Sequence, residues 1–153
     1  MASIAQPAKQ SEEALARYLP AACGVSLNDI SIVKRFDDDE LPVNRLSIIC
    51  RKAARELPEA EPTGCFVCEV SAKLTTHFAE KSGRDHDEAA GAVFDAMMRD
   101  SASICADLNA AMKGESFTAL FFWPPDAIEF STQGKNQISE MVCRLHMLPL
   151  ASE

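Results

Sequence analysis

Apolar and polar side chains alternate along two long stretches of the chain, residues 64–75 and residues 135–147. A period of two residues places successive side chains on opposite faces of a strand, so each stretch is predicted to be a long, half-buried strand. Shorter apolar stretches at residues 30–36, 45–50, 117–123 and 127–131 predict four further strands. The core-facing sides of the two long strands are predicted to comprise Phe66, Cys68, Val70, Ala72 and Leu74 in the first, and Ser139, Met141, Cys143, Leu145 and Met147 in the second.

The first helix is predicted over residues 11–19. Ser11 is a favourable capping residue, and Leu15 and Leu19 fall on one helical stripe. Pro20 lacks a backbone N–H and is expected to end this helix. We expect residues 1–10 to form a flexible N-terminal arm.

A pair of helices is predicted between the two long strands. In residues 90–97, apolar side chains follow the i, i+3, i+4, i+7 spacing of an amphipathic helix, and Asp85 or Asp87 is available as its cap. The second helix of the pair is predicted to begin at the capping residue Ser101 and to end at Gly114.

The predicted order is α β β β α α β β β, which indicates an α+β fold. We expect a single open, mostly antiparallel sheet of about five to six strands, with two or three helices packed on one face. A hydrophobic fraction of 47% and a charged fraction of 25% are typical of globular domains. Residues 1–153 are therefore predicted to form one domain.

Composition and charge narrow the environment and the partners. No apolar run approaches the ~20 residues that cross a bilayer, and the first ten residues lack an apolar signal core, so we expect a soluble protein that is not exported. The six cysteines are then expected to remain free thiols that pack as small hydrophobes. With a net charge of −8 and basic residues scattered along the sequence, tight nucleic-acid binding is not expected.

None of the candidate catalytic or metal-binding patterns is complete. Cys65 and Cys68 form C-x-x-C, but within an alternating strand two residues three apart point to opposite faces, so one metal cannot bind both. His86 lies in a sequence that is predicted to be a solvated helix start. The sequence has no G-x-S-x-G elbow, dinucleotide fingerprint or Walker loop. We expect no catalytic residues, metal or cofactor, and predict that the protein is not an enzyme.

Trp123 ends the densest aromatic stretch of the chain and precedes two prolines. Two interpretations of it remain open from the sequence. Residues 121–123 belong either to a core strand that a rigid turn closes, or to an exposed anchor for a partner protein, because tryptophan is favoured at interface hot spots.

Glu40-Leu41-Pro42 precedes the strand at residues 45–50, and Gly64 then opens the alternating segment at residues 64–70. With the acid-rich start of the helix pair and the final strand after a glycine-containing turn, this order resembles small neck proteins of tailed phages and prophages, the tail terminator or tail completion proteins. The resemblance covers residues 13–147.

The resemblance implies a structural virion protein without enzymatic activity or cofactor. Its copies would close into a ring, typically of six, that caps the tail tube and joins it to the head connector. The partners would be further copies of the chain, the tail tube protein and the head–tail connector protein. DNA would pass through the ring without tight binding, and no membrane would be involved. The protein would be located in the virion neck, and in the host cytoplasm during assembly.

The interacting regions are predicted to be the loops at residues 37–41 and 57–63 and the polar stretch at residues 77–87. The individual residues expected at these contacts are Asp37, Asp38, Asp39, Glu40, Arg84, Asp85 and Trp123. Two other functions remain open. The chain is alternatively another head–tail connector or head-completion adaptor, or a ligand-binding or enzymatic α+β module that uses a cleft between sheet and helices.

Overall fold

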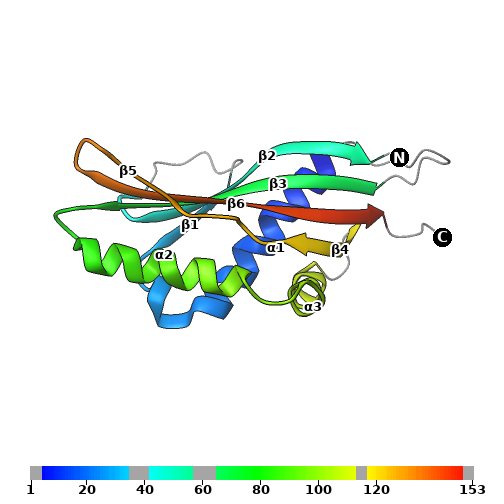
Figure 1. The fold of residues 1–153 in the computed structure, drawn as a ribbon, viewed down its shortest axis with the longest axis horizontal. Coiled ribbons are helices and arrows are strands. Elements are labelled where there is room, and N and C mark those ends of the chain that lie inside the picture. Colours follow the sequence, from blue (N-terminus) through cyan, green and yellow to red (C-terminus); the bar gives the residue numbers. More distant parts are fainter. Residues whose placement is uncertain (1–4, 35–41, 57–64, 113–116, 150–153) are drawn as a thin grey trace.

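The computed structural model describes residues 5–34, 42–56, 65–112 and 117–149. These residues form three α-helices, one short 3-10 helix and six strands (Figure 1). The predicted α+β class and the predicted order of elements are confirmed. The elements are α1 (Ala5–Cys23), η1 (Gly24–Leu27), β1 (Ser31–Lys34), β2 (Arg45–Glu56), β3 (Cys65–His77), α2 (Gly83–Met97), α3 (Ser101–Ala111), β4 (Phe117–Trp123), β5 (Glu129–Gln133) and β6 (Asn136–Pro149).

The strands form one open sheet in the order β1-β2-β3-β6-β4. Only the β1–β2 pair is parallel among the described strands, and the other pairs are antiparallel. β5 pairs with the first residues of β6 and β4 with its last residues, so β4 and β5 follow one another along the same side of β6. The β5–β6 hairpin lies at one end of the molecule, and α3 and β4 lie at the other (Figure 1).

The three helices cover one face of the sheet and bury the predicted apolar sides of the long strands. Leu74 and Leu145 are fully buried in this layer, as are Leu15 of α1, Val93 of α2 and Leu108 of α3. Each such aliphatic side chain contributes roughly 1.5–3 kcal/mol to folding. The alternating pattern therefore correctly identified the core.

The N-terminal prediction is wrong for residues 5–10. Helix α1 begins at Ala5, and Ala8 and Gln10 are buried. Ser11 is not the cap; its hydroxyl lies inside the helix and donates to the Ala8 carbonyl over 2.7 Å. The helix also continues through Pro20, because a proline in the last turn removes only one hydrogen bond while the buried stripe of α1 holds the turn in place.

The caps of the helix pair also differ from the prediction. α2 begins earlier than expected, with Ser82 accepting a hydrogen bond from the Asp85 N–H over 3.1 Å. α3 is capped by Asp100, which accepts from the backbone N–H of Ser103 over 3.0 Å and from its hydroxyl over 2.7 Å. These hydrogen bonds hold the pKa of Asp100 below its usual value. Ser101 is the first residue of α3 instead of its cap.

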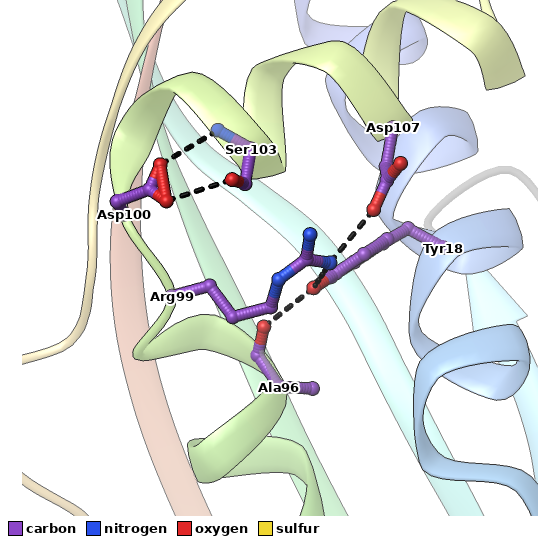
Figure 2. A network of polar contacts seen from close by, with 6 residues as sticks. All are labelled: Tyr18, Ala96, Arg99, Asp100, Ser103 and Asp107. Carbon is purple, nitrogen blue, oxygen red and sulfur yellow. Dashed lines mark hydrogen bonds and ion pairs between the residues drawn. The ribbon is translucent and has the colours of Figure 1, made fainter.

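A polar network joins the three helices where α2 ends and α3 begins (Figure 2). The Tyr18 hydroxyl of α1 donates to the Ala96 carbonyl of α2 over 2.6 Å and accepts from the Arg99 guanidinium over 3.1 Å. The same guanidinium donates to Asp107 of α3 over 2.7 Å, and this bond raises the pKa of Arg99. Tyr18 therefore fixes the relative positions of the helices that cover the core.

Candidate interaction surface

In the described part of the chain, no helix packs on the second face of the sheet, which makes this face a candidate interaction surface. We call it the helix-free face. It carries the side chains that alternate with the core residues of β2, β3 and β6. Its members include Arg45, Ser47 and Ile49 of β2, Glu69, Ser71, Lys73 and Thr75 of β3, and Ile138, Glu140, Val142 and Arg144 of β6.

Basic side chains gather around a hollow on this face, at the side of β1, β2 and β3. Lys34, Arg45, Arg51 and Lys73 all line it. Glu140 lines the same hollow, and its carboxylate accepts a hydrogen bond from the Ser71 hydroxyl over 2.5 Å. The expectation that the basic residues remain scattered is therefore wrong for these four, because strand pairing brings distant positions together.

Acidic side chains gather on the other side of the same face. Asp126, Glu129 and Glu140 line a second, smaller hollow, together with Arg51. Asp126 and Glu129 are exposed. The helix-free face thus has a basic side next to β1 and an acidic side next to β5, although the whole chain carries a net charge of −8. Such a distribution favours contact with a surface that carries the opposite arrangement.

Trp123 lies on the helix-free face instead of in the core. Its ring stacks on His146 with centroids 6.2 Å apart, and the Phe121 ring lies 4.6 Å away. The Arg144 guanidinium carbon is 5.2 Å from the Trp123 centroid, a cation–π contact. Trp123 is half-buried, whereas Phe121 is 43% exposed and Phe122 is buried on the opposite face. β4 is thus a core strand that also presents aromatic rings to solvent, and their use as an anchor for a partner stays a prediction.

Two of the other predicted contact residues, Arg84 and Asp85, are not brought close to Trp123. Arg84 and Asp85 are exposed in the first turn of α2, near the β5–β6 turn, whereas β4 lies at the opposite end of the molecule (Figure 1). Asp37, Asp38, Asp39 and Glu40 lie outside the described residues, as does the loop at residues 57–63.

His86 is buried, contrary to the expectation of a solvated helix start. Its Nδ1 lies 2.7 Å from the Thr76 hydroxyl and its Nε2 lies 2.6 Å from the Ser139 hydroxyl. The Gln137 amide donates to the Thr76 hydroxyl over 3.4 Å and to the Lys81 carbonyl over 2.9 Å. Burial lowers the pKa of His86, so the ring is neutral near pH 7. This cluster resembles a hydroxyl–imidazole catalytic pair in distance, but His86 is 2% exposed and both hydroxyls are buried. It attaches the start of α2 to β3 and β6.

The cysteines pack as expected, and none forms a disulfide. Both members of the C-x-x-C motif are buried, with Cys68 in the core against the helices. A hydrogen bond with Cys50 and burial together raise the pKa of Cys68, and burial raises the pKa of Cys143 to about 12. These thiols are protonated at neutral pH. No group of three metal-binding side chains occurs among residues 5–34, 42–56, 65–112 and 117–149.

Comparison with solved structures gives a match over nearly the whole chain. No protein-family model matches the sequence, and no curated protein does. A chain from a solved structure described as the virion of a native gene transfer agent (GTA) particle has the same fold, with a TM-score of 0.56 at 13% sequence identity. The correspondence covers 97% of this chain and 99% of that chain. None of the helices in the described segments is both long and apolar enough to span a membrane.

Proposed function

We propose that this chain is a structural protein of a phage-like particle, and that it acts as a tail terminator or tail completion protein in the particle's neck. In this role copies of the chain form a closed ring, with six as the expected number. The ring caps the tail tube and presents its other surface to the head connector. The neck of a particle is then its final location.

The observation that carries this proposal is the end-to-end match with a chain of the gene transfer agent virion. Because 97% of one chain corresponds to 99% of the other, the match extends over both chains and is not confined to a common substructure. At 13% identity this likeness supports a shared fold, and the virion context of that chain supports a structural role in a similar particle. The sequence resemblance to tail terminators points independently in the same direction.

The helix-free face gives this proposal a surface on which to act. A ring is built from head-to-tail contacts, in which one surface of a copy binds a different surface of the next. The basic side next to β1 and the acidic side next to β5 are two such different surfaces, and their charges are complementary. The exposed aromatic group around Trp123 and Phe121 is a separate surface, suited to a second kind of partner.

The proposal includes no catalytic step. The closest approach to a catalytic arrangement in the described part of the chain is the pair of hydroxyls on His86, and all three side chains are buried. We therefore assign this cluster to stability.

Co-sedimentation with tail tubes, followed by negative-stain imaging, tests the proposed function. Purified chain is mixed with tubes assembled from the tail tube protein of the same particle. We expect the chain to sediment with the tubes and to form rings with a central hole at their ends. Association with connector-bearing heads in place of tubes would favour a head-completion adaptor, and binding to neither would contradict a role in the neck.

A further inference from the structure

The described strands leave three outer edges on the sheet, those of β1, β4 and β5. An outer strand carries N–H and C=O groups that its single neighbour does not bind, and these groups can pair with a strand of another chain. An edge can pair with another chain only if no other part of its own chain already forms hydrogen bonds with those groups.

The edge of β4 is covered by side chains of α3. Asn109 accepts a hydrogen bond from the Ala119 N–H over 2.6 Å and donates one to the Ala119 carbonyl over 3.1 Å. The Ser101 hydroxyl accepts from the Phe122 N–H over 2.8 Å. These contacts satisfy both outward groups of Ala119 and the N–H of Phe122, so α3 blocks the pairing of another strand at these residues.

The edge of β5 has no such cover among the described residues. β5 pairs only with β6, and all five of its residues are exposed. The hairpin closes through the two residues Gly134 and Lys135, so hydrogen-bonded and non-hydrogen-bonded pairs alternate from the turn. Phe130 and Thr132 fall at the non-hydrogen-bonded positions, and their N–H and C=O groups point away from β6.

β1 is the matching edge on the opposite side of the sheet. It has four residues against the five of β5, and β2 is its only partner strand in the described part of the chain. The Ser31 N–H donates to the Asn44 carbonyl over 3.1 Å, so the alternation directs the N–H and C=O of Ile32 away from β2. The two open edges are therefore of similar length and lie at opposite ends of the strand order.

Among the described residues, the charges around the two edges are complementary. Glu129 is the first residue of β5 and Asp126 precedes it, and both are exposed acids. Lys34 and Arg45 lie at β1 and at the start of β2 on the basic side. Pairing of two β5 edges would bring acids together, whereas pairing of β5 with β1 brings acids next to bases.

We infer that β5 of one copy pairs with β1 of the next copy, so that the sheet continues from subunit to subunit around the ring. This inference rests on the proposed ring and names the contact that builds it. Because β1 and β5 are different surfaces, the contact is head-to-tail and can repeat until it closes. The occupant of each edge is a second copy of this chain.

Proline at Thr132 tests the β5 edge. Thr132→Pro removes an outward N–H and leaves the β5–β6 hydrogen bonds in place, and an edge strand tolerates this change. Thr132→Ala is the matched control, because it alters the side chain and keeps the N–H. We expect Thr132→Pro to be monomeric by analytical ultracentrifugation at concentrations where the wild-type chain and Thr132→Ala assemble. Assembly of Thr132→Pro equal to that of Thr132→Ala would overturn the inference.

Ile32→Pro, with Ile32→Ala as its control, makes the same test at β1. Thermal unfolding of each variant first establishes that it is folded. Each proline variant alone is expected to be monomeric. An equimolar mixture of Thr132→Pro and Ile32→Pro retains one intact β5 edge and one intact β1 edge, so it is expected to form heterodimers and no rings. Homodimers of Ile32→Pro alone would show that β5 pairs with β5, and would contradict a head-to-tail contact.

The same variants separate this inference from the proposed function. Capping of tail tubes by wild type and Thr132→Pro alike would reject the edge contact and leave the neck function intact. Edge-dependent assembly without binding to tubes would support the contact and reject the neck function. Hydrogen exchange of the Phe130 and Thr132 amides provides a second readout, and slower exchange in the assembled form is expected. Unchanged exchange on assembly would contradict the contact.

Discussion

The imidazole of His86, in the first turns of α2, lies 2.6 Å from the Ser139 hydroxyl of β6. The second ring nitrogen meets the Thr76 hydroxyl of β3, so one side chain connects α2 to the two central strands. Because the ring is buried and its pKa is lowered, folding favours the neutral form. This relationship makes the stability of the fold depend on pH.

The first prediction concerns that pH dependence. The unfolded chain binds a proton at His86 near pH 6.5, whereas the folded chain does so only at lower pH. The contribution of neutral His86 to the free energy of unfolding is therefore fully present above about pH 6.5. It is lost as the pH falls toward the lowered pKa of His86 in the folded state. Urea unfolding of the wild type and of His86→Gln, at several values between about pH 5 and about pH 8, compares how the free energy of unfolding of each protein depends on pH. Parallel pH profiles for the two proteins would contradict a buried neutral His86.

The second prediction concerns Asn109, which covers the edge of β4. Asn109→Ala removes the donor for the Ala119 carbonyl and the acceptor for both the Ala119 N–H and the Thr118 hydroxyl. We expect a loss of roughly 1–3 kcal/mol in the free energy of unfolding, because partly buried backbone groups lose their partners.

Asn109→Asp is the control for the β4 edge, since it keeps the acceptor and loses only the donor. In chemical denaturation, Asn109→Asp should lower the free energy of unfolding by less than Asn109→Ala does. Light scattering of folded Asn109→Ala is also expected to increase, because an uncovered strand edge promotes association. Equal stability of the two variants and the wild type would show that α3 does not protect this edge.

The third prediction concerns the helix network in Figure 2. Tyr18→Phe removes the hydroxyl that contacts both the Ala96 carbonyl and the Arg99 guanidinium. The loss of this buried hydrogen bond should destabilise the fold by about 1 kcal/mol. Asp107→Asn is a useful comparison, because the Arg99–Asp107 pair is exposed and screened by solvent, so its loss should change the stability less. A larger loss in Asp107→Asn than in Tyr18→Phe would reverse the assigned importance of the two contacts.

The fourth prediction concerns the basic side of the helix-free face. Lys73→Glu reverses one charge of the hollow, and Lys9→Glu makes the same charge change on the exposed side of α1. If complementary charges align neighbouring copies, Lys73→Glu weakens assembly and Lys9→Glu does not. Sedimentation velocity at low and high salt measures both variants. Equal assembly of the two would remove the basic hollow from the interface.

The sequence was sufficient to predict the fold because its strongest signals are periodic. Phe66 to Leu74 alternate without interruption, and the structure buries that side of β3. The signal was weaker where a strand is irregular. β2 continues to Glu56, but the bulge between Cys50 and Lys52 shifts the alternation and hid the second half of the strand. Glu12 supports this bulge by accepting from the Cys50 N–H over 2.8 Å, and no local pattern indicates that this helical acid is buried against β2.

The interaction surface could be predicted only in part. Trp123 was identified because an aromatic run before two prolines is visible locally. The basic hollow was missed because Lys34, Arg51 and Lys73 come from three strands, and their proximity depends on strand register. His86 was placed in solvent although it lies four residues before Ala90 and seven before Val93, on the stripe that became the buried side of α2.

Growth of tail tubes in the presence of the purified chain is the decisive test of the proposed tail-terminator role. Tube protein is polymerised with increasing amounts of the chain, and the distribution of tube lengths is measured by electron microscopy over time. We predict that tubes stop elongating at lengths that shorten as more chain is added, with a ring at each arrested end. Tubes that elongate at the same rate with and without the chain, and whose ends carry no ring, would contradict the account.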